Sequence, residues 1–290
     1  PQPGEVRVRA VASAISQGTE MLVYRGQVEP AMALDLPTLR GRFGFPIKYG
    51  YASVGQVVES RSESADLEIG RYVFVHHPHQ SEYVVPATYA VPLPEGIDPV
   101  VGVFLANLET AVNVLLDAAP RLGERIVVFG QGVVGLLLTQ LLRRTGAGQV
   151  LTVDAFERRR ELSRRLGADV VLSPDENVAA TVREWTEGVG ADLVIEASGS
   201  PLALDQAIDC AAFQGTIVVC SWYGTKPVTL DLGGAFHRGR LRLVSSQVSN
   251  LDPALQPRWS IPRRRALARR LLVELELAPL ITHRVPVERA

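Results

Sequence analysis

Cysteine is scarce in this sequence, and neither sign of charge prevails. The two cysteines, Cys210 and Cys220, cannot form a disulfide framework and do not make a CxxC pair, so we expect a reducing, cytoplasmic setting. Each stands among apolar residues, where cysteine usually serves as a small hydrophobic side chain. The 30 basic and 31 acidic side chains leave a net charge of −1, which argues against a nucleic-acid partner.

Long hydrophobic runs are missing as well. No apolar run is expected to reach the length of a membrane span, so we predict no membrane association. The composition, with 47% hydrophobic and 21% charged residues, is ordinary for a soluble globular protein. At 290 residues, the chain is long enough for a large core and for more than one domain.

The hydrophobic pattern changes near Val101 and divides the chain into two kinds of structure. Up to about Pro94, short alternating segments such as EVRVRAVA and YASVGQVVES are interrupted by Gly and Pro, as in a small barrel or sandwich. Beyond Val101, apolar segments such as RIVVFG and ADLVIEAS alternate with helical stretches. This alternation predicts an α/β fold with a doubly wound parallel sheet.

A glycine-rich turn gives the strongest functional signal. In RIVVFGQGVVGLLL, the residues Gly130, Gly132 and Gly135 form G-x-G-x-x-G between a predicted strand and a predicted helix. The first glycine permits a tight turn, the second admits a pyrophosphate, and the third lets the helix pack closely on the strand. N–H groups at the start of the helix would then bind the phosphates. Alone, the motif also fits a plain strand–helix turn, so its context decides.

An acidic residue follows at the distance that a dinucleotide site requires. Asp154 ends the next predicted strand, about 20 residues after the last glycine, where an acid binds the adenosine ribose hydroxyls. A carboxylate there repels a 2′-phosphate, which favours NAD(H), while Arg158 and Arg159 leave NADP(H) open as the second choice. The competing interpretation is that Asp154 only caps the helix that follows.

Together these segments resemble the medium-chain dehydrogenase/reductase superfamily, of the zinc-type alcohol dehydrogenase kind. Besides the cofactor segment, PQPGEVRVRAVASAIS resembles its opening strand, YGYASVGQVVES its glycine–histidine–glutamate segment, and LITHRVPVERA its closing strand and last helix. The resemblance implies a GroES-like β-barrel catalytic domain at 1–104 and 249–290 and a Rossmann domain at 105–248. It also implies a homodimer, in which RLRLVSSQVS, at 240–249, would be an edge strand that pairs with the partner's copy.

The resemblance further implies a set of contacts with a nicotinamide cofactor. They lie in the glycine-rich turn, at the ends of the strands and beside the nicotinamide: Thr110, Gly130, Gly132, Val133, Val134, Gly135, Asp154, Arg159, Ser198, Gly199, Ser221 and Ser246.

The positions that hold the catalytic metal in zinc members carry other residues here. The resemblance places Gln17, Tyr51 and Ala106 where those enzymes have a cysteine, a histidine and a third cysteine or acidic ligand. An amide, a phenol and a methyl group do not make a zinc site, because zinc prefers thiolate, imidazole or carboxylate. The cysteine-rich structural zinc lobe is absent too. We therefore predict no metal.

Three histidines that are close in sequence, His76, His77 and His79, are the one feature that favours a metal site. In VFVHHPHQSEY, alternation along a strand would put His76 and His77 on opposite faces, and Pro78 would interrupt the ladder. We expect exposed imidazoles at a strand end. The alternative places one of them, most plausibly His79, in the substrate cleft.

Without zinc, the negative charge that develops on a substrate oxygen needs a hydrogen-bond donor. Tyr51 is the predicted donor because it replaces the metal's histidine, and Lys48 would lower the pKa of its phenol. The competing interpretation of Tyr51 is an aromatic side chain packed in a barrel strand. His79 and Glu109 are further catalytic candidates, and His237 is a weaker one.

The sequence thus predicts a zinc-independent NAD(P)(H)-dependent oxidoreductase that transfers hydride between nicotinamide and an alcohol or carbonyl substrate. An enone or quinone reductase of the same superfamily is the nearest alternative, and ISQGTE also resembles zinc-poor dehydrogenases that act on hydroxyethyl bacteriochlorophyllides. A non-catalytic dinucleotide-binding protein is the alternative from another class.

Overall fold

The structure, a computed structural model, describes residues 1–34 and 38–289. They group into two compact units. The first contains Pro1–Leu108, Gly224–Lys226 and Arg265–Glu274, and the second contains Glu109–Tyr223, Pro227–Arg264 and Leu275–Ala290. The domain boundaries predicted from the resemblance stay predictions.

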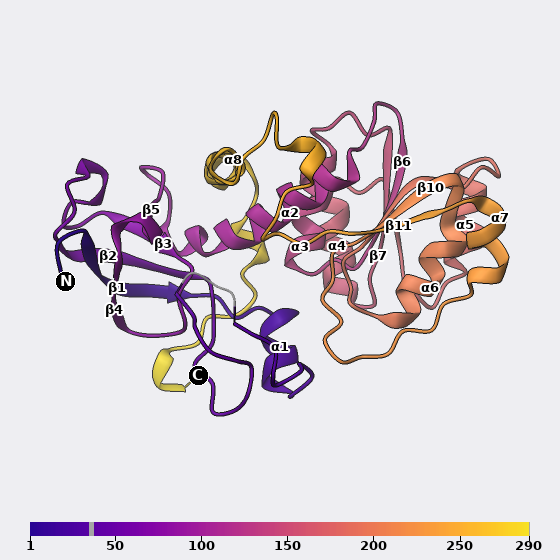
Figure 1. The fold of residues 1–290 in the computed structure, drawn as a ribbon. Helices are drawn as coiled ribbons and strands as arrows, with labels where there is room; N and C mark the ends of the chain where they lie inside the picture. The colour runs from indigo at the N-terminus through magenta and orange to yellow at the C-terminus, as the bar shows by residue number, and fades with distance from the viewer. Residues whose placement is uncertain (35–37, 290) are drawn as a thin grey trace. The chain divides into compact units, whose positions relative to one another are not determined.

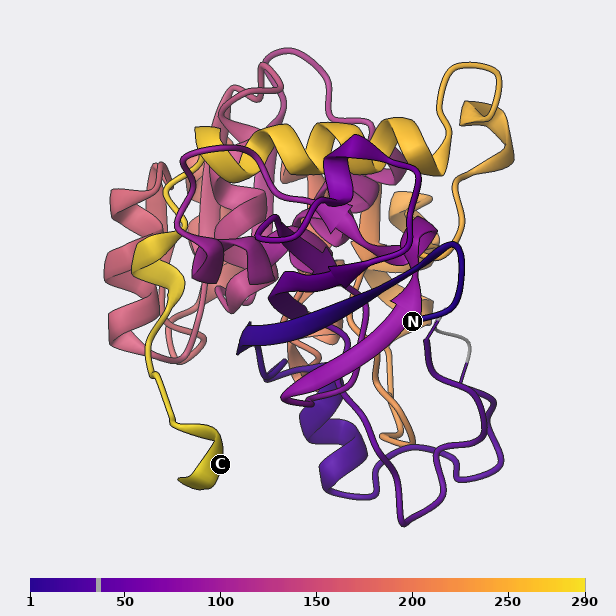
Figure 2. The ribbon, with the colours of Figure 1, turned by 90° about the vertical axis from the view of Figure 1, so that its left-hand side faces the viewer.

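The first unit is built on an antiparallel five-stranded sheet with the order β4-β1-β2-β3-β5 (Figures 1 and 2). Its strands are β1 (Glu5–Ser13), β2 (Ser53–Ser60), β3 (Tyr72–Val75), β4 (Glu82–Pro86) and β5 (Val91–Pro92). Alternating valines of β1, β2 and β3 are fully buried on one face, so the period-two pattern of the sequence sets the sheet's core face. A short helix, α1 (Thr19–Tyr24), follows β1.

The second unit holds a six-stranded parallel sheet with the order β11-β10-β9-β6-β7-β8. The strands are β6 (Arg125–Phe129), β7 (Gln149–Val153), β8 (Val170–Leu172), β9 (Ala191–Glu196), β10 (Ala211–Val219) and β11 (Arg242–Ser245). The helices α3 (Val133–Leu142), α4 (Glu157–Arg165), α5 (Val178–Trp185), α6 (Pro201–Cys210) and α7 (His237–Gly239) lie between them in the chain. Two longer helices, α2 (Leu105–Ala118) and α8 (Ile261–Glu274), contain residues of both units.

The apolar runs of the sequence form the middle of this sheet. Residues 126–129 of β6 are at most 1% exposed, as expected for a parallel strand covered on both faces. The strand order reverses at β6, between its neighbours β9 and β7. In open α/β sheets, ligands bind outside the carboxyl ends of the strands at such a point. The predicted α/β fold class, with an antiparallel sheet and a Rossmann-type parallel sheet, is confirmed.

Three local expectations need correction. Strand β3 ends at Val75, before the histidines, so strand alternation does not orient them. LITHRVPVERA forms no closing strand: residues 281–286 have no regular structure, and a single 3-10 turn follows at Val287–Arg289. The stretch Pro99–Ala118 is, against expectation, long and apolar enough to span a membrane, but 61% of it is buried inside the protein, as in a core helix.

Strand β11 lies at the edge of the parallel sheet, where the sequence placed it. Pairing of this edge with a second copy, and hence the homodimer, stays a prediction.

Candidate active site

The glycine-rich turn connects β6 to α3 and brings three backbone segments together. Gly130 has φ +90°, and a Cβ there would lie 2.6 Å from the Cα of Ser198. A Cβ on Gly135 would lie 1.9 Å from the carbonyl oxygen of Gly130, so both positions need glycine. A Cβ on Gly132 would meet no atom within 4 Å, so the turn is open on this side. Glycine is thus required for packing at two positions, and the third offers bare backbone to a ligand.

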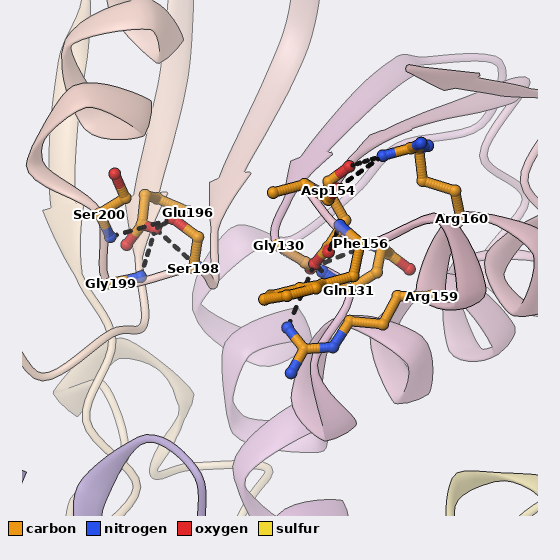
Figure 3. A network of polar contacts seen from close by, with 11 residues as sticks. Gly130, Gln131, Asp154, Phe156, Arg159, Arg160, Glu196, Ser198, Gly199 and Ser200 are labelled. Atoms are coloured by element: carbon orange, nitrogen blue, oxygen red, sulfur yellow. Dashed lines mark hydrogen bonds and ion pairs between the residues drawn. The ribbon is translucent and has the colours of Figure 1, made fainter. Parts of the chain in front are cut away.

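Asp154 follows β7 and turns its carboxylate toward this glycine-rich turn (Figure 3). The residue is 7% exposed. Its Oδ2 accepts a hydrogen bond from the backbone N–H of Gln131 at 2.7 Å. Its Oδ1 accepts one from the backbone N–H of Phe156 at 2.8 Å, at the N-cap of α4. The N-cap of α4 is Phe156 and no side chain caps the helix, so the capping interpretation of Asp154 is wrong; its carboxylate joins the backbone before α4 to the glycine-rich turn.

Two arginines of α4 surround Asp154. The guanidinium of Arg159 lies 4.6 Å from the centre of the Phe156 ring, and its Nη1 is 3.6 Å from Asp154 Oδ2. The Arg160 guanidinium donates to the backbone carbonyls of Asp154 and Ala155. Arg159 thus lies beside Asp154, as the sequence suggested, whereas Arg160 binds the backbone at Asp154 and was not foreseen.

Glu196, at the end of β9, is a second buried acid that the sequence interpretation missed. It is 0% exposed, and its Oε1 accepts hydrogen bonds from the N–H and hydroxyl of Ser198, both at 2.6 Å, and from the N–H of Gly199 at 2.8 Å (Figure 3). Because the backbone of Ser198 packs on Gly130, this carboxylate fixes the loop that borders the glycine-rich turn. The signal in the sequence was an acid that closes an otherwise apolar strand.

Ser221 and Ser246 follow the carboxyl ends of strands of the parallel sheet, and Thr110 is on α2. The Ser221 hydroxyl is 3.5 Å from the carbonyl oxygen of Glu196. The Ser246 hydroxyl, just after β11, donates to Asp117 Oδ2 at 2.5 Å, so it is engaged with α2. Thr110 and the buried Glu109 are also on α2, while His237 is exposed on α7.

The second cluster of polar side chains lies in the first unit, around Tyr51. This residue precedes β2, so it is not part of a barrel strand. Although the residue keeps some solvent contact, burial of its phenol raises the pKa above the ordinary tyrosine value, and hydrogen bonds with the hydroxyls of Ser16 and Thr19 lower it in part. The negative charge of Glu20 raises the pKa further. The phenol therefore keeps its proton at neutral pH.

The effect expected of Lys48 on the Tyr51 pKa is wrong in direction. The pKa of this phenol is raised, with burial as the main cause. The ammonium group of Lys48 donates to Gln80 Oε1, and its charge lowers the pKa of His77, with burial as the larger cause.

The three histidines occupy three different environments rather than one exposed strand end. His77 is 8% exposed and stacks on the Tyr83 ring at 3.8 Å. His76 Nδ1 lies 3.1 Å from the backbone carbonyl oxygen of Tyr51, so it can donate to the segment that carries the predicted donor. His79, with 36% of its side chain exposed, is bonded at both ring nitrogens, to Glu20 and Ser13.

A zinc ion does not fit the side chains at the family's metal positions. Gln17, Tyr51 and Ala106 supply an amide, a phenol and a methyl group. Within residues 1–34 and 38–289, no three His, Cys, Asp or Glu side chains are grouped so that they could hold a metal ion. A nicotinamide dinucleotide does fit, because the second unit offers an open glycine-rich turn beside a buried, oriented acid.

Comparisons with known proteins agree with this geometry. The sequence profile of the zinc-binding dehydrogenase family matches residues 133–260. A D-guloside 3-dehydrogenase from Escherichia coli (strain K12) is 29% identical over 277 residues, which cover 89% of this chain and 78% of that protein.

Two solved structures share the fold. The NADP-bound structure of a Sinorhizobium meliloti 1021 protein, assigned to the zinc-binding dehydrogenases, matches with 22% identity and a TM-score of 0.74, over 95% of this chain and 83% of that one. An alcohol dehydrogenase from Escherichia coli CFT073, complexed with NADH, matches with 19% identity and a TM-score of 0.74, over 96% and 84%. Residues 133–260 thus match the zinc-binding dehydrogenase family, and the chain as a whole is similar to dehydrogenases in sequence and in fold.

Proposed function

We propose that this chain is a zinc-independent oxidoreductase that transfers hydride between NAD(P)(H) and an alcohol or carbonyl substrate. The observation that carries the proposal is the protonated, partly buried phenol of Tyr51, at the position where zinc members of the family hold their metal. When bound, the cofactor supplies or accepts the hydride. The chain must then supply a partner for the charge on the substrate oxygen, and Tyr51 is that partner.

The raised pKa of the Tyr51 phenol determines its proposed role in catalysis. A phenol that keeps its proton donates a hydrogen bond to the carbonyl oxygen and stabilises the negative charge that forms as hydride arrives. It then gives its proton to that oxygen. In the reverse direction Tyr51 must first lose its proton before the phenolate oxygen can accept the alcohol proton, so the raised pKa favours carbonyl reduction at neutral pH. The hydroxyls of Ser16 and Thr19 stabilise the phenolate while it lasts.

NADH is the proposed preferred cofactor. The Asp154 carboxylate is held in place by two backbone N–H groups, and each of its oxygens keeps a second lone pair for a ribose hydroxyl. A 2′-phosphate would meet this negative charge at close range. Arg159 offsets part of that repulsion, so weaker use of NADPH is part of the proposal.

The name of the relative from Escherichia coli (strain K12) suggests where to look for the substrate. It acts on the 3-position of a D-guloside, and we propose a secondary alcohol or the matching ketone as the reacting group. A panel of glycosides, sugar alcohols and simple secondary alcohols covers this class. Enones and quinones belong in the same panel, because they test the nearest alternative.

The test is a turnover assay with NAD(P)H or NAD(P)+ over this panel, in the presence of a metal chelator, together with elemental analysis. We expect turnover that chelator does not reduce and added zinc does not raise, and no stoichiometric zinc in the purified protein. One tightly held zinc per chain, with activity lost in chelator, would overturn the proposal. Cofactor binding without turnover on any substrate would support the dinucleotide-binding alternative instead.

A further inference from the structure

Glu20, His79 and Ser13 form a continuous chain of hydrogen bonds in the first unit. His79 Nε2 lies 2.7 Å from Glu20 Oε2, and His79 Nδ1 lies 2.5 Å from Ser13 Oγ. An imidazole that is bonded through both nitrogens can accept a proton at one of them and release a proton at the other. The three side chains come from α1, from the segment after β3 and from the end of β1.

The inner end of this chain borders Tyr51. Glu20 is 8% exposed, and its Oε1 accepts a hydrogen bond from the backbone N–H of Ser16 at 3.1 Å. The hydroxyls of Ser16 and Thr19 contact the Tyr51 phenol, and the charge of Glu20 acts on the same phenol. A buried carboxylate is costly unless it is paired, so the place of Glu20 beside a phenol and an imidazole is a chemical feature rather than a solvated surface charge.

The outer end reaches water. His79 has 36% of its side chain exposed, and Ser13 is only partly buried. Protons from solvent can therefore arrive at the His79–Ser13 end while Glu20 stays enclosed.

The backbone is shaped around this histidine. Gly50 has φ +120°, and a Cβ there would lie 2.8 Å from His79 Cδ2 and 2.9 Å from its Nε2. The backbone N–H of His79 donates to the carbonyl oxygen of Tyr49 at 3.2 Å. Tyr49 and Gly50, the two residues before Tyr51, thus contact His79. The same turn therefore positions both the phenol and the imidazole.

We propose that Glu20, His79 and Ser13 are a proton relay that connects Tyr51 with solvent. The relay rests on the proposed function, in which Tyr51 loses or gains one proton in every turnover. Glu20 and Ser13 have no role in that proposal otherwise, and His79 acts through Glu20 instead of touching the substrate.

The proton balance in the direction of carbonyl reduction is simple. A bound nicotinamide would supply the hydride for the new C–H bond at the carbonyl carbon, and the Tyr51 O–H bond breaks as the O–H bond of the product alcohol forms. The phenolate recovers a proton from the Glu20–His79 pair, whose carboxylate is bonded to the Ser16 backbone and acts on the phenol. His79 then takes one proton from water at its Ser13 side. One proton from solvent is consumed for each hydride transferred, and oxidation runs the same path in reverse.

The test uses His79→Ala in the full chain, assayed on the best substrate of the panel with and without added imidazole. We expect kcat to fall on the order of a hundredfold, the typical worth of positioned acid–base groups, with the affinity for the cofactor unchanged. Imidazole, which fits the space beside Gly50, should restore a large part of kcat. The solvent deuterium isotope effect on kcat should rise, because proton delivery becomes limiting.

Glu20→Gln is the second variant, since it keeps the shape and the hydrogen-bond contacts of Glu20 but cannot carry the proton as a carboxylate does. It should lose kcat by a similar factor and should not respond to imidazole. His283→Ala, which changes a histidine bonded to Thr282 near the end of the chain, is the matched control and should behave as the wild type. If His79→Ala does not fold, Glu20→Gln alone decides.

The outcomes separate the relay from the proposed function. A wild-type protein without turnover overturns the proposed function and the relay with it. Wild-type turnover together with an unchanged kcat and isotope effect in His79→Ala or Glu20→Gln overturns the relay only. A loss in His79→Ala that imidazole does not restore would also overturn it, because it would show that His79 only supports the turn around Gly50.

Discussion

Asp154 accepts a hydrogen bond from the backbone N–H of Gln131, with 2.7 Å between Oδ2 and the nitrogen. This contact ties the end of β7 to the glycine-rich turn after β6. The orientation of the acid is therefore set by the protein before any ribose is bound. Pre-orientation of this kind lowers the entropy that the cofactor site must lose on binding.

The cofactor preference follows from this carboxylate. Asp154→Asn keeps the shape of the side chain but removes the charge, so NADH binding should weaken by about tenfold or more, as expected for a charge-assisted hydrogen bond worth about 1.5–3 kcal/mol. NADPH binding should weaken less or improve. Isothermal calorimetry with both cofactors measures the difference. Asp192→Asn, at the start of β9 on the opposite edge of the sheet, is the control, and tighter binding of NADPH by the wild type would contradict the assignment.

Glu196 should affect the affinity for the cofactor without taking part in hydride or proton transfer. In Glu196→Ala, the N–H groups of Ser198 and Gly199 lose a charged acceptor, and a hydrogen bond to a charged group contributes about 1.5–3 kcal/mol of folding stability. The loop beside Gly130 should then loosen, and NADH should bind more weakly. Urea unfolding and a fluorescence titration measure the two effects. A Glu196→Ala protein with wild-type affinity would show that this loop takes no part in binding.

The stability of the first unit should fall in alkali because of Tyr83. This side chain is buried, it donates to Ser53 Oγ at 2.9 Å, and burial raises the pKa of its phenol from 10.0 to about 12. A raised pKa means that the folded state holds the proton more tightly than the unfolded state. The stabilisation is complete below pH 10 and is lost as the pH rises from 10 toward 12, by on the order of 2–3 kcal/mol for a shift of about two units.

Tyr83→Phe is the variant that isolates this effect. Denaturant unfolding at several pH values above 9 should give a shallower loss of stability than in the wild type. An identical slope for the two proteins would show that other groups cause the alkaline loss.

Much of the fold was predictable because its signals are local. The apolar strands of residues 126–129 and 193–195 predict a parallel sheet. Strands that are covered on both faces read as continuous apolar runs, without alternating polar residues. The glycine spacing predicts the turn between β6 and α3, because a Cβ on Gly130 or Gly135 would collide with backbone atoms. Both signals depend on residues that are neighbours in the chain.

The active-site clusters were harder because their members are far apart in the sequence. Ser13, Glu20 and His79 are brought together by the tertiary fold, and nothing in their local sequence predicts that they are bonded to one another. The expectation for Lys48 failed for the same reason: three residues of separation from Tyr51 suggested contact, but the turn directs the ammonium group to Gln80. The histidine segment failed because β3 ends at Val75, two residues earlier than the alternation assumed.

The turnover number of Tyr51→Phe tests the central claim most directly. The substitution removes one hydroxyl and little else. If the phenol stabilises the charge on the substrate oxygen, kcat should fall on the order of a hundredfold or more, while the dissociation constant of the cofactor stays nearly unchanged. A Tyr51→Phe protein with the wild-type kcat would contradict the account and would reduce Tyr51 to a packing residue.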